Sequence, residues 1–130
     1  MIFDEKRKQW VVLTPEEWVR QNTYQWLVQL LKYPQEMIAV EKEIKLFDLA
    51  KRFDMLVYDN NVQPWMMIEC KAQSVPITQK TLMQVLRYNI AVPVPYLLIT
   101  NGLQVRAFRK IEGKLEELDV MPEWRMDHRL

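Results

Sequence analysis

The pattern of apolar residues along the chain predicts a series of short strands separated by turns. Each segment is rich in β-branched, aromatic or other apolar residues and is bounded by turn formers. These segments are residues 9–13, 37–46, 53–58, 65–70, 96–100 and 105–109, followed by 114–118 as a last edge strand. Residues 96–100 (YLLIT) are almost wholly apolar, which is typical of a central strand buried on both faces.

Two helices are predicted between these strands. Thr14 is a helix N-cap, Pro15 suits the first helical position, and Glu17 follows the cap by three residues. This first helix is expected to run to about residue 32, and a second helix from about residue 78 to residue 90. The predicted fold is α/β (α+β), with a central mixed β-sheet flanked by helices.

Composition indicates one small domain over residues 1–130, because 49% hydrophobic content in 130 residues supports a single core. No apolar run is long enough for a membrane span. The N-terminus carries acids and lacks an apolar signal region, so a cytoplasmic location is expected. The single cysteine, which excludes an internal disulfide, agrees with that location. The net charge of +1 lacks the basic surplus of dedicated DNA binders. Weak DNA affinity of the isolated domain is therefore expected.

Two predicted strands carry an acid each and form a hairpin, with turn formers at residues 59–64. Asp54 and Glu69 fall opposite or nearly opposite each other in that hairpin, where directly opposed Cβ atoms lie about 5 Å apart. Lys71 projects from the same face as Glu69. Two carboxylates this close repel each other, and a divalent cation such as Mg²⁺ would remove the conflict. The alternative is that both acids pair with nearby basic residues at a solvated strand end.

Asp54 and the run Glu69-Cys70-Lys71 resemble the D-(E/D)-x-K signature of the PD-(D/E)XK nuclease superfamily. Gln84 and Tyr88 resemble the Q-x-x-x-Y motif of the branch that contains the N-terminal nuclease domain of type I restriction enzyme motor subunits. The order of elements also matches, and the similarity covers a core of about residues 14–109. Residues 122–130 form a polar tail that is expected to be frayed. No P-loop for a helicase motor is visible.

The resemblance implies a restriction-endonuclease-like core that binds Mg²⁺ or Mn²⁺. Asp54, Glu69 and the backbone carbonyl of Cys70 would be the metal ligands. Lys71 would position or activate the attacking water and offset phosphate charge. The Cys70 thiol should point to the opposite face of the strand, into the core, and is not expected to act as a nucleophile.

The resemblance also assigns roles on the two helices. The family often places an acid on the first helix that reaches the metal, and Glu17 fits that position, although its place in the capping box explains it equally well and the adjacent Glu16 is an alternative. Arg20 would contact phosphate or pair with one of these two acids. Gln84 and Tyr88, four residues apart on one helix face, would orient the lysine or contact the DNA backbone, or else be ordinary polar positions.

The predicted function is a Mg²⁺- or Mn²⁺-dependent DNA endonuclease domain that works beside motor and specificity proteins, with DNA as partner and no membrane. A homodimer that cuts both strands is a further arrangement that the sequence leaves open. The alternative function is a non-catalytic DNA- or protein-binding module on the same fold. A carboxylate-metal phosphohydrolase acting on RNA or nucleotides is a third, weaker interpretation.

Overall fold

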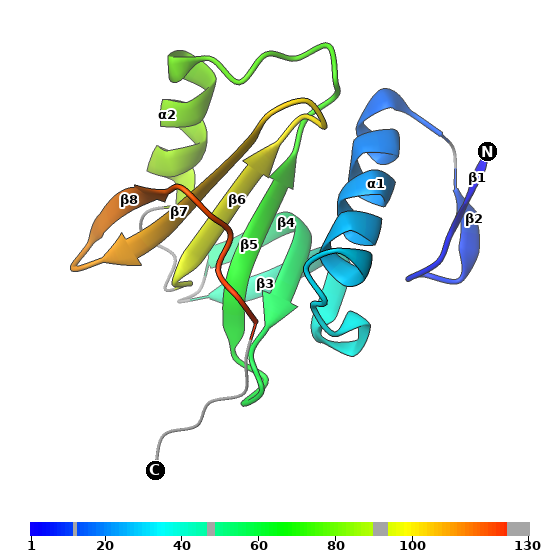
Figure 1. Cartoon of the computed structure of the whole chain (residues 1–130), viewed down its shortest axis with the longest axis horizontal. Coiled ribbons are helices and arrows are strands. Elements are labelled where there is room, and N and C mark those ends of the chain that lie inside the picture. The colour runs from blue at the N-terminus through cyan, green and yellow to red at the C-terminus, as the bar shows by residue number, and fades with distance from the viewer. Residues whose placement is uncertain (12, 47–48, 90–93, 125–130) are drawn as a thin grey trace.

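The computed structural model describes residues 1–11, 13–46, 49–89 and 94–124, without the side chains of residues 11, 41–46, 49–52 and 88. A six-stranded mixed sheet forms its centre (Figure 1). The strand order is β3-β4-β5-β6-β7-β8, and among the residues described only β5 and β6 pair in parallel. The elements of the sheet are β3 (Ile38–Leu46), β4 (Leu49–Tyr58), β5 (Pro64–Cys70), β6 (Tyr96–Thr100), β7 (Val105–Ile111) and β8 (Lys114–Leu118). The predicted α+β fold with a mixed sheet is confirmed.

The two helices cover opposite faces of this sheet, which therefore has two apolar layers. Helix α1 (Pro15–Gln29) contributes Val19 and Leu27 to a cluster with Met66 and Ile68 of β5. Helix α2 (Gln79–Asn89) contributes to the second cluster, which contains Met67 of the same strand. Because successive side chains of β5 point to opposite faces, one short apolar strand serves both layers.

Helix α1 starts as the sequence predicts and ends earlier. The Thr14 hydroxyl accepts a hydrogen bond of 3.0 Å from the amide of Glu17, as an N-cap should. The helix ends at Gln29, three residues before the predicted end. The amide of Tyr33 bonds to the carbonyl of Leu27 at 2.9 Å, and Lys32 has a φ of 60°. The left-handed backbone conformation of Lys32 turns the chain away from the helix axis.

The hairpin between β4 and β5 is confirmed with the predicted turn. Asp59 Oδ1 accepts hydrogen bonds from the amides of Asn61 at 2.9 Å and Gln63 at 3.0 Å, and Val62 has a φ of 57°. The strands pair in the register Met55 with Ile68 and Leu56 with Met67. Continued by one residue, this register sets Asp54 against Glu69.

Two features at the chain ends differ from the sequence prediction. A short strand, β1 (Ile2–Asp4), pairs with β2 (Gln9–Val11) in a separate hairpin that the apolar pattern did not reveal. Part of the tail from residue 122 is packed, because the Trp124 indole donates a 2.8 Å hydrogen bond to the carbonyl of Tyr58. The rest of that tail lies outside the described residues. Within the described part of the chain, no helix is both long and apolar enough to cross a membrane.

Candidate active site

Asp54 and Glu69 form a carboxylate pair at one end of the β4–β5 ladder. The Asp54 Oδ2 atom accepts a 2.7 Å hydrogen bond from the Cys70 amide, which ties the side chain of β4 to the backbone of β5. Phe53 and Met55 pack in different core clusters, although strict alternation would place them on the same face. Asp54 therefore lies between residues of the two core clusters, and its carboxylate contacts the backbone at the end of β5.

Glu69 is a largely buried carboxylate that lies beside a second acid, Asp54. Burial raises the pKa of Glu69 to about 7, and the charge of Asp54 and a side-chain hydrogen bond with it also raise this pKa. The charge of Lys71 acts in the opposite direction. The carboxylate pair predicted from the hairpin register is thus present, and a neighbouring cation would stabilise its ionised form.

Lys71 directly follows β5 and belongs to the same small group of charges. Its amide donates a 2.8 Å hydrogen bond to the carbonyl of Thr100, the last residue of β6. Its side chain is half-buried. The backbone at Lys71 is therefore held by the central strand β6, and the following loop starts from a fixed point.

Cys70 lies between these two residues and has a different role. Its side chain is buried in the cluster under α1, as alternation along the strand predicts. Burial raises the pKa of the thiol far above its usual range, and a hydrogen bond with Thr23 only partly opposes this effect. The thiol is therefore kept protonated and away from solvent, which does not suit a nucleophile.

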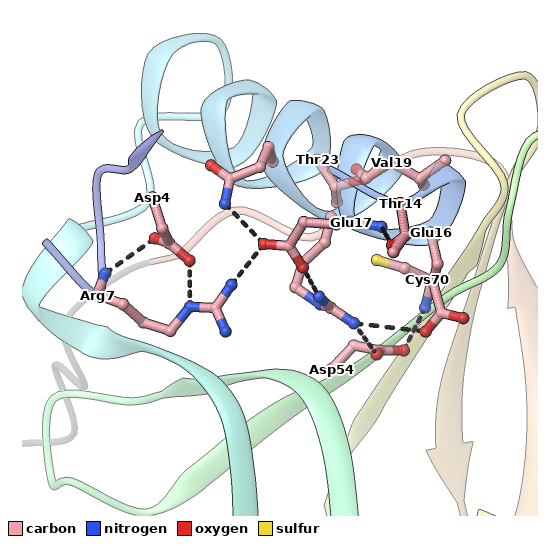
Figure 2. Close-up of polar contacts among 11 residues, drawn as sticks. Asp4, Arg7, Thr14, Glu16, Glu17, Val19, Thr23, Asp54 and Cys70 are labelled. Carbon is pink, nitrogen blue, oxygen red and sulfur yellow. Dashed lines mark hydrogen bonds and ion pairs between the residues drawn. The ribbon is translucent and has the colours of Figure 1, made fainter. Parts of the chain in front are cut away.

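Helix α1 brings a chain of buried charges to Asp54 (Figure 2). Arg20 Nη2 lies 3.0 Å from Asp54 Oδ1, and Arg20 also pairs with Glu17, one turn earlier on the helix. Glu17 in turn pairs with Arg7 and accepts a 3.0 Å hydrogen bond from Gln21. Glu17 and Arg20 are both less than 10% exposed. The first-helix acid predicted to reach a metal is thus held by two arginines.

The sequence predicted part of this arrangement. Arg20 was expected to contact phosphate or to pair with Glu16 or Glu17. In the structure it pairs with both acids. Its contact with Glu16, which is half exposed, is 3.4 Å long. The contact of Arg20 with Asp54 and that of Arg7 with Glu17 were not foreseen. Neither has a signal in sequence spacing, because each joins residues from different elements.

The helix α2 carries both residues of the predicted Q-x-x-x-Y motif. Gln84 is exposed, and within the described residues its side chain forms no hydrogen bond or ion pair. The side chain of Tyr88 lies outside the described residues. The roles predicted for these two residues therefore stay predictions.

The donor atoms at this site fit a hard divalent cation. Mg²⁺ is commonly held by one or two carboxylates together with water, and Asp54 and Glu69 supply two carboxylates whose mutual repulsion a cation would relieve. In the described part of the chain, no cluster of three or more His, Cys, Asp and Glu side chains is arranged to hold a metal. The Cys70 carbonyl is the predicted further ligand.

Comparison with known proteins gives two findings. The model of a family described as type I restriction enzyme R protein N terminus matches residues 15–122. A DUF820 protein from Anabaena variabilis, whose crystal structure is described as that of a proposed nuclease, has a similar fold with a TM-score of 0.53 and 12% identity. The alignment covers 87% of this chain and 72% of the other. No curated protein matches the sequence.

Proposed function

The chain belongs to the family of type I restriction enzyme R protein N termini, and on that basis we propose that it is a metal-dependent DNA endonuclease domain that hydrolyses phosphodiester bonds. The observation that carries the proposal is the carboxylate pair of Asp54 and Glu69, with Lys71 beside it. A hairpin built for stability alone should avoid two acids in this position. The fold shared with a proposed nuclease supports the same conclusion.

The residues that would hold the cation are Asp54, Glu69 and the Cys70 carbonyl. Mg²⁺ or Mn²⁺ would supply a Lewis acid for the phosphate charge and lower the pKa of the attacking water. The carboxylates must be ionised to bind it, and Glu69 loses its proton near neutral pH. The hydrogen bond from the Cys70 amide keeps one oxygen of Asp54 in a fixed direction.

Lys71 would act on the reacting atoms. Its ammonium group would donate hydrogen bonds to the attacking water or to a phosphate oxygen, and it would offset negative charge as the phosphorus gains its fifth bond. The attacking water gives up a proton as its oxygen adds to phosphorus, the bond to the leaving sugar oxygen breaks, and that oxygen takes up a proton. Gln84 and Tyr88 would contact the DNA backbone or orient Lys71.

Targeting would come from partner proteins. The net charge of +1 is small for a domain that must hold DNA by itself. The family name refers to type I restriction enzymes, and we propose that motor and specificity proteins of this class deliver the domain to DNA. A homodimer that cuts both strands is compatible with this scheme.

The experiment that tests the proposal is cleavage of supercoiled plasmid with Mn²⁺. Wild type is compared with Glu69→Ala and Lys71→Ala, and Lys114→Ala on the exposed edge strand β8 is the matched control. The proposal is supported if wild type and Lys114→Ala nick the plasmid and the other two variants do not. Equal nicking by all four proteins contradicts it, because the activity would then come from elsewhere.

One observation favours the alternative of a non-catalytic binding module on this fold. Arg20 supplies a positive partner to Asp54, so that acid has a structural role without any metal. This alternative predicts no nicking and no change of melting temperature when Mn²⁺ is added. Nicking that requires Glu69 excludes it.

A further inference from the structure

We infer that Arg7, on the N-terminal hairpin, is a positioning residue for Asp54 and that it acts through Glu17 and Arg20. The hairpin of β1 and β2 lies before the region that matches the family, which begins at residue 15. The effect on cleavage rests on the proposed function, whereas the contacts themselves do not.

The first step is that the hairpin holds Arg7 rigidly. The Asp4 Oδ1 atom accepts hydrogen bonds from the amides of Lys6 at 2.8 Å and Arg7 at 2.9 Å, and the Lys8 amide bonds to the Asp4 carbonyl at 2.7 Å. The Arg7 side chain also pairs with the Asp4 carboxylate, which is 2% exposed. Both the backbone and the guanidinium of Arg7 are therefore fixed by one buried acid.

The second step is the link from Arg7 to helix α1. The Arg7 Nη2 atom pairs with Glu17 Oε1 (Figure 2). Arg20 Nη1 pairs with Glu17 Oε2. The two oxygens of one carboxylate thus hold two different arginines. The side chains of Arg7, Glu17 and Arg20 are 18%, 6% and 8% exposed, so water screens these contacts little.

The third step is the link from α1 to the carboxylate pair. Arg20 Nη2 is 3.0 Å from Asp54 Oδ1, and the other oxygen of Asp54 is held by the Cys70 amide. Removing Arg7 leaves Arg20 as the main positive partner of Glu17. We therefore expect the guanidinium of Arg20 to shift towards Glu17 and to weaken its contact with Asp54.

The Cys70 amide gives a readout of Asp54 that does not depend on cleavage. Its N–H donates directly to Asp54 Oδ2, so a rotation of that carboxylate changes the amide resonance. We compare ¹H,¹⁵N spectra of the full chain with Arg7→Gln and with Lys8→Gln. Lys8 is the control because its side chain is 75% exposed and lies 3.9 Å from Glu5, outside the buried chain.

The expected result is a shift of the Cys70 amide resonance in Arg7→Gln and none in Lys8→Gln. The amides of Leu56 and Met67, inside the same hairpin, serve as a control for the fold and should stay in place in both variants. In the Glu17→Gln background, Arg7→Gln should cause no further shift, because its route to Asp54 is already broken. An unchanged Cys70 amide in Arg7→Gln, or an equal further shift in the Glu17→Gln background, overturns the inference.

The same variants test the consequence for cleavage. Arg7→Gln should lower kcat for plasmid nicking by about 10- to 100-fold with KM for DNA unchanged, as for other residues that orient a metal ligand. Arg7→Lys, which keeps the charge, should recover part of kcat. Arg7→Met, which also removes the charge, replaces Arg7→Gln if that variant does not fold. A wild type that never nicks DNA contradicts the proposed function, while the amide spectra still decide the role of Arg7.

Discussion

The guanidinium of Arg20 on α1 lies 3.0 Å from the carboxylate of Asp54 on β4, a residue 34 positions later in the chain. This contact joins the helix that covers one face of the sheet to the acid at the end of the hairpin. It also supplies a positive charge at the point where two carboxylates meet. Stability and the proposed chemistry of the site therefore depend on the same group.

Replacement of Arg20 by alanine should destabilise the protein strongly. Its partners Glu17 and Asp54 are mostly buried, and loss of one partner from a buried ion pair typically costs about 3–5 kcal/mol. Urea unfolding measures this loss. Arg106→Ala is the control, since the Arg106–Glu117 pair is exposed and such pairs contribute about 0–1 kcal/mol. Equal effects of the two substitutions would contradict the buried network.

The free energy of unfolding should depend on pH through the ionisation of Glu69. Its pKa is raised from 4.5 to about 7 in the folded state, so the folded protein binds more protons than the unfolded chain between these values. The free energy of unfolding should therefore fall as pH rises through this window, by up to about 3 kcal/mol. Urea unfolding of wild type and Glu69→Gln at pH 4.5 to 8 checks this. A fall of the same size in the variant would contradict the assignment.

Metal binding should stabilise the folded protein only when the acid pair is intact. Mn²⁺ at about 100 times its dissociation constant should add about 2.7 kcal/mol to the free energy of unfolding. The melting temperature of wild type should therefore rise with Mn²⁺, and that of Asp54→Asn should not. Glu117→Gln, which removes an exposed acid from β8, is the control and should respond as wild type does. A response of Asp54→Asn equal to that of wild type would exclude this metal site.

Gln84 should affect cleavage and not stability. Its side chain is exposed on α2, so Gln84→Ala should change the free energy of unfolding by no more than about 0.5 kcal/mol. If it contacts DNA or orients Lys71, the nicking rate should fall about tenfold or more. Gln79→Ala, an exposed glutamine at the start of the same helix, is the matched control. Equal nicking rates for the two variants would remove Gln84 from the site.

The Cys70 thiol should be unreactive in the folded protein. Burial raises its pKa and excludes reagents from the cluster under α1. A chromogenic disulfide reagent should react with it slowly in buffer and at once in denaturant, and the ratio of the two rates follows the unfolding equilibrium. Rapid reaction without denaturant would contradict the buried position.

The sequence by itself predicted the strands of the six-stranded sheet and the pair of acids. Apolar, β-prone runs and the turn residues around Asp59 specify a hairpin, and a register shift between Val57 and Tyr58 sets the final pairing of its strands. Any hairpin with this turn brings Asp54 opposite or nearly opposite Glu69, so the pair of acids could be predicted from local pattern. The Thr14 cap and the start of α1 are determined locally in the same way.

Only the tertiary structure decided how the site is supported. The contacts of Arg7 with Glu17 and of Arg20 with Asp54 join residues on different elements, and they exist because α1 packs on the sheet with the N-terminal hairpin beside it. The hydrogen bond from the Trp124 indole to the Tyr58 carbonyl likewise depends on how the C-terminal segment folds back to the β4–β5 hairpin. Side-chain periodicity shows which face of an element is buried, whereas the partner of a buried charge depends on which elements meet.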